Sequence, residues 1–214
     1  MAGLPLLSAF YFGSVEHYAL IAAHARVIID IGEHYERQSY RTRTAIMGAN
    51  GVQHLQVHIA RRSGEKMPMR TVGLSYDEAW HAQHLHAIRS AYGQTPWFIH
   101  YIDDIEAVLR QRHARLVDLN LATLRLALGW LGLKTNVEVQ DRYVEAGDVT
   151  GENLMDLRLA LHPKRPWPAA LPAPSSYTQV FADRHGFARR LSIIDLVMNM
   201  GPGAAQVLRG PGLA

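Results

Sequence analysis

Arginine and histidine side chains alternate along a stretch of the chain that is typical of a β-hairpin. Residues 41–47 and 52–60 have strand-like patterns, and the turn-forming Gly48-Ala49-Asn50-Gly51 joins them. Because side chains alternate between the two faces of a strand, one face of this hairpin carries four polar residues, namely Arg41, Arg43, His54 and His58. Such a face could bind an anion such as a phosphate or a carboxylate. A solvated sheet face would show the same alternation.

A second group of histidines follows a predicted capping box, in which Ser75 and Glu78 open a helix that ends near Gly93. On this helix His81 and His84 lie three residues apart and face the same side, whereas His86 points away from His84. We predict no metal site, because no third ligand occurs at a suitable spacing. A single histidine could serve as a general base, since imidazole titrates near neutral pH. Residue spacing does not identify which one.

A polar stripe follows the helix predicted to start at Ser192 and to stop at Gly201-Pro202. Ser192, Asp195 and Asn199 are spaced so that they share one side of this helix. Capping of the helix N-terminus explains Ser192 and Asp195. It does not explain Asn199, which lies one turn from the other end.

Several classes of protein are excluded by what the 214 residues lack. The chain has no cysteine, which excludes disulfides, thiolate zinc sites, iron–sulfur clusters and a cysteine nucleophile. The GxxxxGK[ST], GxGxxG and GxSxG motifs are absent. The net charge is 22 − 19 = +3, and the arginines are scattered, so we expect no nucleic acid as partner. No segment is typical of a membrane span or of a leader peptide, and we expect a cytoplasmic protein.

The predicted elements suggest an α+β, or irregular α/β, protein. Strands come early, helices fill the middle, and the tail is mixed. The predicted helices are residues 14–25, 75–92, 96–112 and 116–131, and the predicted strands are 26–31, 41–47 and 52–60 (the hairpin) and 135–140. We expect a small mixed sheet with an early β-hairpin packed against several helices. With 48% hydrophobic residues the chain suits a single domain of residues 1–214, with a proline-rich loop or arm at 162–174.

Three stretches, taken in order, resemble the WbqC-like protein family of bacteria. The first is Tyr35-Glu36-Arg37-Gln38-Ser39-Tyr40-Arg41-Thr42-Arg43 followed by Gly48-Ala49-Asn50-Gly51. The second is Gln83-His84-Leu85 with Ser90-Ala91-Tyr92 and Thr95-Pro96-Trp97-Phe98. The third is Leu191-Ser192-Ile193-Ile194-Asp195-Leu196 through Asn199-Met200-Gly201-Pro202. The opening Tyr11-Phe12-Gly13-Ser14-Val15-Glu16-His17-Tyr18 and His162-Pro163-Lys164 fit as well.

The resemblance implies a role in the synthesis of bacterial surface polysaccharides of the O-antigen type. For such proteins the attachment of an amino acid or acyl group to an amino sugar has been suggested. The donor would be an acyl-CoA, an acyl carrier or a nucleotide-activated substrate, and the acceptor a nucleotide-activated amino sugar. Some relatives have cysteine where this chain has Thr44, so a thiol mechanism is not available here.

Two hypotheses follow from the polar residues inside these motifs. In a transferase, Arg41 and Arg43 would bind phosphates, His84 would accept a proton from the attacking amine, and Asp195 would orient His84 or the substrate. Asn50 and Asn199 would be further substrate-binding residues, with Asn199 contacting a sugar hydroxyl or carbonyl. The alternative is a non-catalytic binding or assembly protein of the same pathway. The sequence leaves open whether the protein is an enzyme and whether it forms a homo-oligomer.

Overall fold

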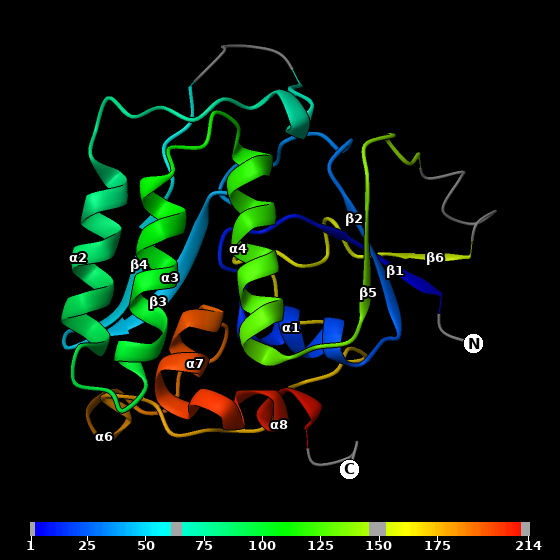
Figure 1. The fold of residues 1–214 in the computed structure, drawn as a ribbon. Helices are drawn as coiled ribbons and strands as arrows, with labels where there is room; N and C mark the ends of the chain where they lie inside the picture. Colours follow the sequence, from blue (N-terminus) through cyan, green and yellow to red (C-terminus); the bar gives the residue numbers. More distant parts are fainter. Residues whose placement is uncertain (1–2, 61–65, 146–152, 211–214) are drawn as a thin grey trace.

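Four short parallel strands form the central sheet, and a separate antiparallel hairpin lies beside it (Figure 1). The computed structural model describes residues 3–60, 66–145 and 153–210. The strands are β1 (Leu4–Ser8), β2 (Arg26–Asp30), β3 (Arg43–Gly48), β4 (Gly51–Gln56), β5 (Asn136–Gln140) and β6 (Leu154–Asp156). The helices are α1 (Val15–Ala22), α2 (Trp80–Tyr92), α3 (Phe98–Arg110), α4 (Leu116–Leu131), α6 (Ala182–His185), α7 (Ile193–Met200) and α8 (Ala204–Arg209), with short 3₁₀ helices η1 (Met69–Thr71) and η2 (Gly201–Gly203).

The sheet has the strand order β5-β2-β1-β6, with all neighbours parallel. Helix α1 connects β1 to β2, and the hairpin with α2, α3 and α4 is inserted between β2 and β5. In Figure 1, α1 and α4 lie on one side of the sheet, and α2 and α3 lie farther out beside the hairpin. The α+β fold class is therefore confirmed.

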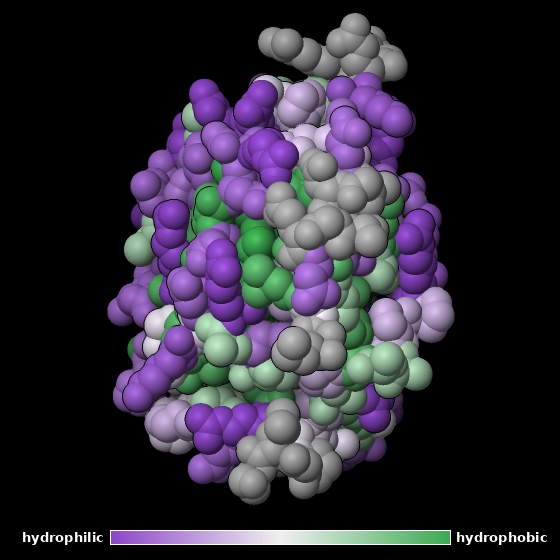
Figure 2. Space-filling model, turned by 90° about the vertical axis from the view of Figure 1, so that its right-hand side faces the viewer, coloured by the Kyte–Doolittle hydropathy of each residue, from purple (hydrophilic) through white to green (hydrophobic). Residues whose placement is uncertain are grey.

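The two faces of the sheet bury different side chains, as the alternation along each strand requires. Leu7, Val27 and Ile29 join the main core with the helices. Leu6 and Ile28 point to the opposite face, where Val144 covers them in a small separate cluster. Figure 2 shows this side of the molecule, where apolar residues are surrounded by hydrophilic ones.

A network of buried charges closes the carboxyl edge of the sheet. The Arg41 guanidinium is fully buried and donates to both carboxylate oxygens of Glu33, at 2.9 and 2.5 Å. It also donates to Ser8 Oγ at the end of β1 and to the carbonyl of Arg158, just after β6. The Arg158 guanidinium in turn binds Asp30 at the end of β2, at 2.6 Å. Two arginines thus join the ends of three strands through side-chain contacts, in addition to the backbone pairing of the sheet.

The hairpin and most helices lie where the sequence predicts them. Strands β3 and β4 pair in one continuous register from Arg43 with Gln56 to Gly48 with Gly51. Helix α4 spans the predicted 116–131, and Ser192 caps α7 by accepting a hydrogen bond from Ile194 N–H. Residues 162–174 contain no helix or strand.

Three features differ from the prediction. The capping box at Ser75 is wrong, because Ser75 bonds to Asp77 in its own turn and α2 begins only at Trp80. Strands β1 and β6 were not predicted, since β1 is buried on both faces and shows no alternation, and β6 has three residues. Helix α7 is not the last helix, because η2 leads directly into α8.

In the part of the chain that the structure describes, no helix has the length and apolar character needed to cross a lipid bilayer.

Replacing Arg41 by alanine should destabilise the protein by about 3–5 kcal/mol, because Glu33 would remain buried without its cation. The free energy of unfolding measured in urea would show the loss. Arg37→Ala, at an exposed position four residues earlier, serves as the control and should change stability by less than about 0.5 kcal/mol. Equal losses in the two variants would contradict a structural role for the buried pair.

Candidate functional site

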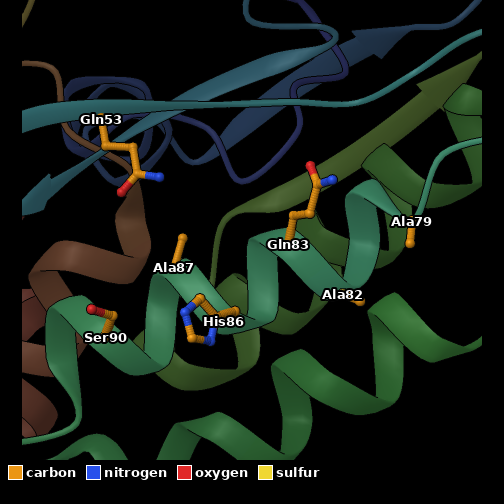
Figure 3. A pocket seen from close by; sticks show the side chains of 7 residues that line it. All are labelled: Gln53, Ala79, Ala82, Gln83, His86, Ala87 and Ser90. Carbon is orange, nitrogen blue, oxygen red and sulfur yellow. The ribbon is translucent and has the colours of Figure 1, made fainter.

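A groove runs along the outer side of helix α2 to the turn of the hairpin (Figure 3). It consists of two adjoining hollows of about 560 and 400 Å3, which share Gln53, Ala87 and Ser90. The first hollow lies between Gln53 of β4 and the exposed residues of α2. The second is bounded by the turn residues 48–52 and the end of α2.

The groove has a neutral lining. Its floor is made of four alanines, namely Ala79 at the N-cap of α2 and Ala82, Ala87 and Ala91 within the helix. Its polar groups are the side chains of Asn50, Gln53, Gln83, His86 and Ser90. Figure 3 shows Gln53 reaching from the hairpin towards α2 and Gln83 pointing from α2 towards the hairpin. Among these lining residues none is Lys, Arg, Asp or Glu, and His86 is the titratable one.

The stretches that carry the family resemblance supply much of this lining. Gly48-Ala49-Asn50-Gly51 forms the wall of the second hollow. Gln83 and Ser90-Ala91 come from the helical stretches. The fold therefore brings two separate motifs together at one surface, and Asn50 is the predicted site residue that lies there.

His84 lies inside the protein instead of in the groove. It is 4% exposed, and its ring packs against Trp80 and Tyr11. The Nδ1 atom accepts a hydrogen bond from the Tyr11 hydroxyl at 2.9 Å, and the other ring nitrogen donates to the Gln56 carbonyl. Burial lowers the pKa of His84 to about 4. His84 thus connects α2 to β4 and to the loop after β1 as a neutral side chain.

Asp195 is also buried, and the structure does not pair it with His84. Its carboxylate accepts hydrogen bonds from the hydroxyls of Tyr92 and Tyr177, both at 2.7 Å. Burial raises the pKa of Asp195 to about 6, although the two hydroxyl donors oppose this shift. The Tyr92 oxygen also accepts from Met47 N–H on β3, so Asp195 fixes the end of α2 against the hairpin.

Asn199 anchors the segment that follows the proline-rich loop. Its Nδ2 donates to the Asp195 carbonyl, and its Oδ1 accepts from Val180 N–H. These two bonds explain the polar residue that helix capping did not. Asp195 and Asn199 are the two predicted site residues that the structure brings into contact.

The two arginines do not form one phosphate-binding face. Arg41 belongs to the buried charge network and is fully covered. Arg43 is half-buried and pairs with Gln56, at the end of the hairpin opposite Asn50. Strand β3 from Arg43 to Gly48 spans about 16 Å at 3.3 Å per residue, so Arg43 lies this far from the turn that contains Asn50.

Thr44 has a structural partner in the loop after β1. Its hydroxyl donates to the Phe12 carbonyl at 2.8 Å, and Ser192 Oγ donates to the same oxygen at 3.1 Å. Phe12 has a positive φ of 40°, which is strained for a bulky side chain. Two hydroxyls on its carbonyl and Thr123 Oγ1 accepting from its N–H hold this conformation.

Sequence reasoning missed the structural partners Arg158 and Tyr177. Both lie outside the quoted motifs, and no spacing relates them to Asp30 or Asp195, so only the tertiary structure could have identified them. His86 was recognised as a histidine pointing away from His84, and that orientation is what places it in the groove. Within the described residues, no group of three or more His, Cys, Asp or Glu side chains could hold a metal ion.

The fold is that of an α+β protein with an open groove of neutral lining between a hairpin and a helix. A family model described as the WbqC-like protein family matches residues 10–166, and the chain belongs to this family. No curated protein and no solved structure matches the chain.

Asp195 should make the stability of the protein depend on pH between about 4 and 6. Its pKa is higher in the folded state than the ordinary value near 3.9, so in this range the native state binds more protons than the unfolded state. The free energy of unfolding contributed by Asp195 therefore falls as the pH rises through this range.

Urea unfolding of the wild type and of Asp195→Asn at pH 4 to 8 would measure this contribution. The stability of the wild type relative to the variant should decrease from pH 4 to 6 and then level off. The other buried carboxyls are common to both proteins and cancel in the difference. A difference that stays constant over the whole range would show that the pKa of Asp195 is not raised in the folded state.

Proposed function

We propose that this protein is a transferase that attaches an amino acid or acyl group to an amino sugar in the synthesis of a bacterial surface polysaccharide. The observation that carries the proposal is the groove, because motif residues from the hairpin turn and from α2 line it together. Membership of the WbqC-like family supports the polysaccharide pathway.

The lining of the groove suits a sugar. Amide side chains such as Gln53, Gln83 and Asn50 can both donate and accept hydrogen bonds, which matches sugar hydroxyls. The alanine floor offers apolar surface for the carbon face of a sugar ring. Because none of the described residues that line the groove is an arginine or a lysine, the phosphates of a nucleotide-activated sugar would lie outside it, in solvent.

The transfer needs a base, and His86 is the side chain in the groove that can provide it. The amine nitrogen of the sugar attacks the acyl carbon, and a new C–N bond forms. The bond from that carbon to the leaving group breaks, and the leaving group takes the electron pair. The excess proton on nitrogen passes to the His86 imidazole, which can return it to the leaving group.

The buried predicted residues position the groove and do not touch the substrate in this proposal. His84 acts from the first half of α2 through Gln56 of β4. Asp195 acts on the last residue of α2, Tyr92, which also bonds to Met47 of β3. They thereby set the distance between the helix and the hairpin. Arg41 has the corresponding role at the sheet edge, where it holds the segment that leads into β3.

The alternative is a non-catalytic binding protein of the same pathway. The observation that favours this alternative is the lack of a carboxylate among the described residues that line the groove, since a carboxylate could orient His86 as a base. Under this alternative the same groove would bind a saccharide without changing it.

Replacing His86 by glutamine should lower turnover by about 10²-fold or more while substrate binding changes little. The assay would follow transfer of aminoacyl and acyl thioesters to nucleotide-activated amino sugars by mass spectrometry. His100→Gln, an exposed histidine on α3, is the matched control and should retain activity.

Full activity of His86→Gln would exclude His86 as the base. Saccharide binding without turnover in the wild type, for every donor tested, would favour the binding protein.

A further inference from the structure

The hairpin has two outer edges, and its register shows which backbone groups point outwards. Val57 N–H donates to the Thr42 carbonyl, so this pair is hydrogen-bonded. Bonded and non-bonded pairs alternate in an antiparallel ladder. With the observed register, Gln53 and Leu55 bond to β3, whereas the backbone groups of Val52 and His54 point away from it.

The two edges differ in what covers them. On β3, Met47 N–H donates to the Tyr92 hydroxyl, and the Ala45 carbonyl accepts from Ser192 N–H. On β4, the Gln56 carbonyl accepts from His84. In the described part of the chain, the outward N–H and C=O groups of Val52 and His54 have no hydrogen-bond partner.

This open edge borders the groove. Val52 and Gln53 belong to the lining of its second hollow, and the Val52 side chain is 51% exposed. On the other side of the groove the alanines of α2 leave room for a main chain to approach closely. The groove is therefore bounded by a strand with free backbone donors and acceptors and by a helix with small side chains.

We propose that the groove binds the donor as an extended aminoacyl or short peptidyl group whose main chain pairs with the edge of β4 at Val52 and His54. This inference rests on the proposed function. Of the two donors considered there, it selects the aminoacyl donor over the acyl donor, because a simple acyl chain offers no N–H to the strand. An extended segment added to a sheet edge gains its affinity from main-chain bonds, and the pockets beside it select side chains.

The charge at the helix end of the groove agrees with such a donor. Asp77 and Glu78 immediately precede Ala79 and are exposed. Their carboxylates favour an ammonium group, which an uncapped aminoacyl donor carries. The length of the free edge, two outward residues, suits a donor of one to three amino-acid units, since each outward residue can exchange two hydrogen bonds with one unit.

The probe is acetyl-Ala-Ala-amide, titrated into the whole ¹⁵N-labelled protein and followed by NMR. We expect shifts of the Val52 and His54 amide signals and of signals along α2. The matched ligand control is the same dipeptide with both alanine nitrogens methylated, which keeps its side chains and carbonyls and removes the two main-chain N–H donors. Its affinity should be at least 10-fold weaker. Equal affinity of the two ligands, or no binding of the first at millimolar concentration, would overturn the proposal.

A variant of the protein tests the same main-chain hydrogen bonds by removing a donor from β4 instead of from the ligand. His54→Pro removes one outward N–H without breaking the ladder to β3, and proline is tolerated on an edge strand. It should lose at least 10-fold in affinity for acetyl-Ala-Ala-amide, whereas His54→Ala, which keeps the N–H, should bind as the wild type does. Equal binding by both variants would overturn strand pairing. If His54→Pro fails to fold, the methylated dipeptide decides alone.

The transfer assay separates this inference from the proposed function. Turnover with acyl donors but not with aminoacyl donors would contradict the inference and leave the transferase in place. Binding of the dipeptide without turnover of any donor would support the inference and contradict the transferase.

Discussion

The fold depends on one fully buried guanidinium. Arg41 joins the end of β1 through Ser8, the loop after β2 through Glu33, and the chain after β6 through the Arg158 carbonyl. A four-stranded sheet with a three-residue edge strand has few backbone bonds of its own. The charge network supplies polar contacts between strand ends that are far apart in the sequence. A buried ion pair of this kind fixes geometry more than it adds net stability, because both charges are desolvated.

The position of the groove depends on a second set of buried polar contacts. His84 connects α2 to β4, and the Asp195–Tyr92 pair connects α2 to β3, so the helix is attached to both strands of the hairpin. Each contact is a hydrogen bond with a fixed direction, unlike the apolar packing around it. The groove between the hairpin turn and α2 is consequently a defined surface on which neutral polar groups and an open strand edge face the same space.

Sequence patterns predicted the parts of the fold that depend on local chemistry. The alternation in β4, the helix at 116–131 and the cap at Ser192 all depend on residues a few positions apart. The same reasoning failed at Ser75, where a side chain suited to capping forms a turn with Asp77 instead. It also missed β1, because a strand buried on both faces lacks the alternation that identifies a strand.

By itself the sequence determined the fold class, the hairpin, most of the helices and the family resemblance, since these follow from residue types and short spacings. Only the tertiary structure decided what those residues do. It buries Arg41, His84 and Asp195 beside partners 8 to 117 positions away in the chain, and it leaves Asn50 and His86 on the groove. Burial and pairing are set by packing between residues far apart in the chain, which local spacing does not encode. A polar residue in a motif can therefore be either a buried residue that holds the fold together or an exposed residue of the groove.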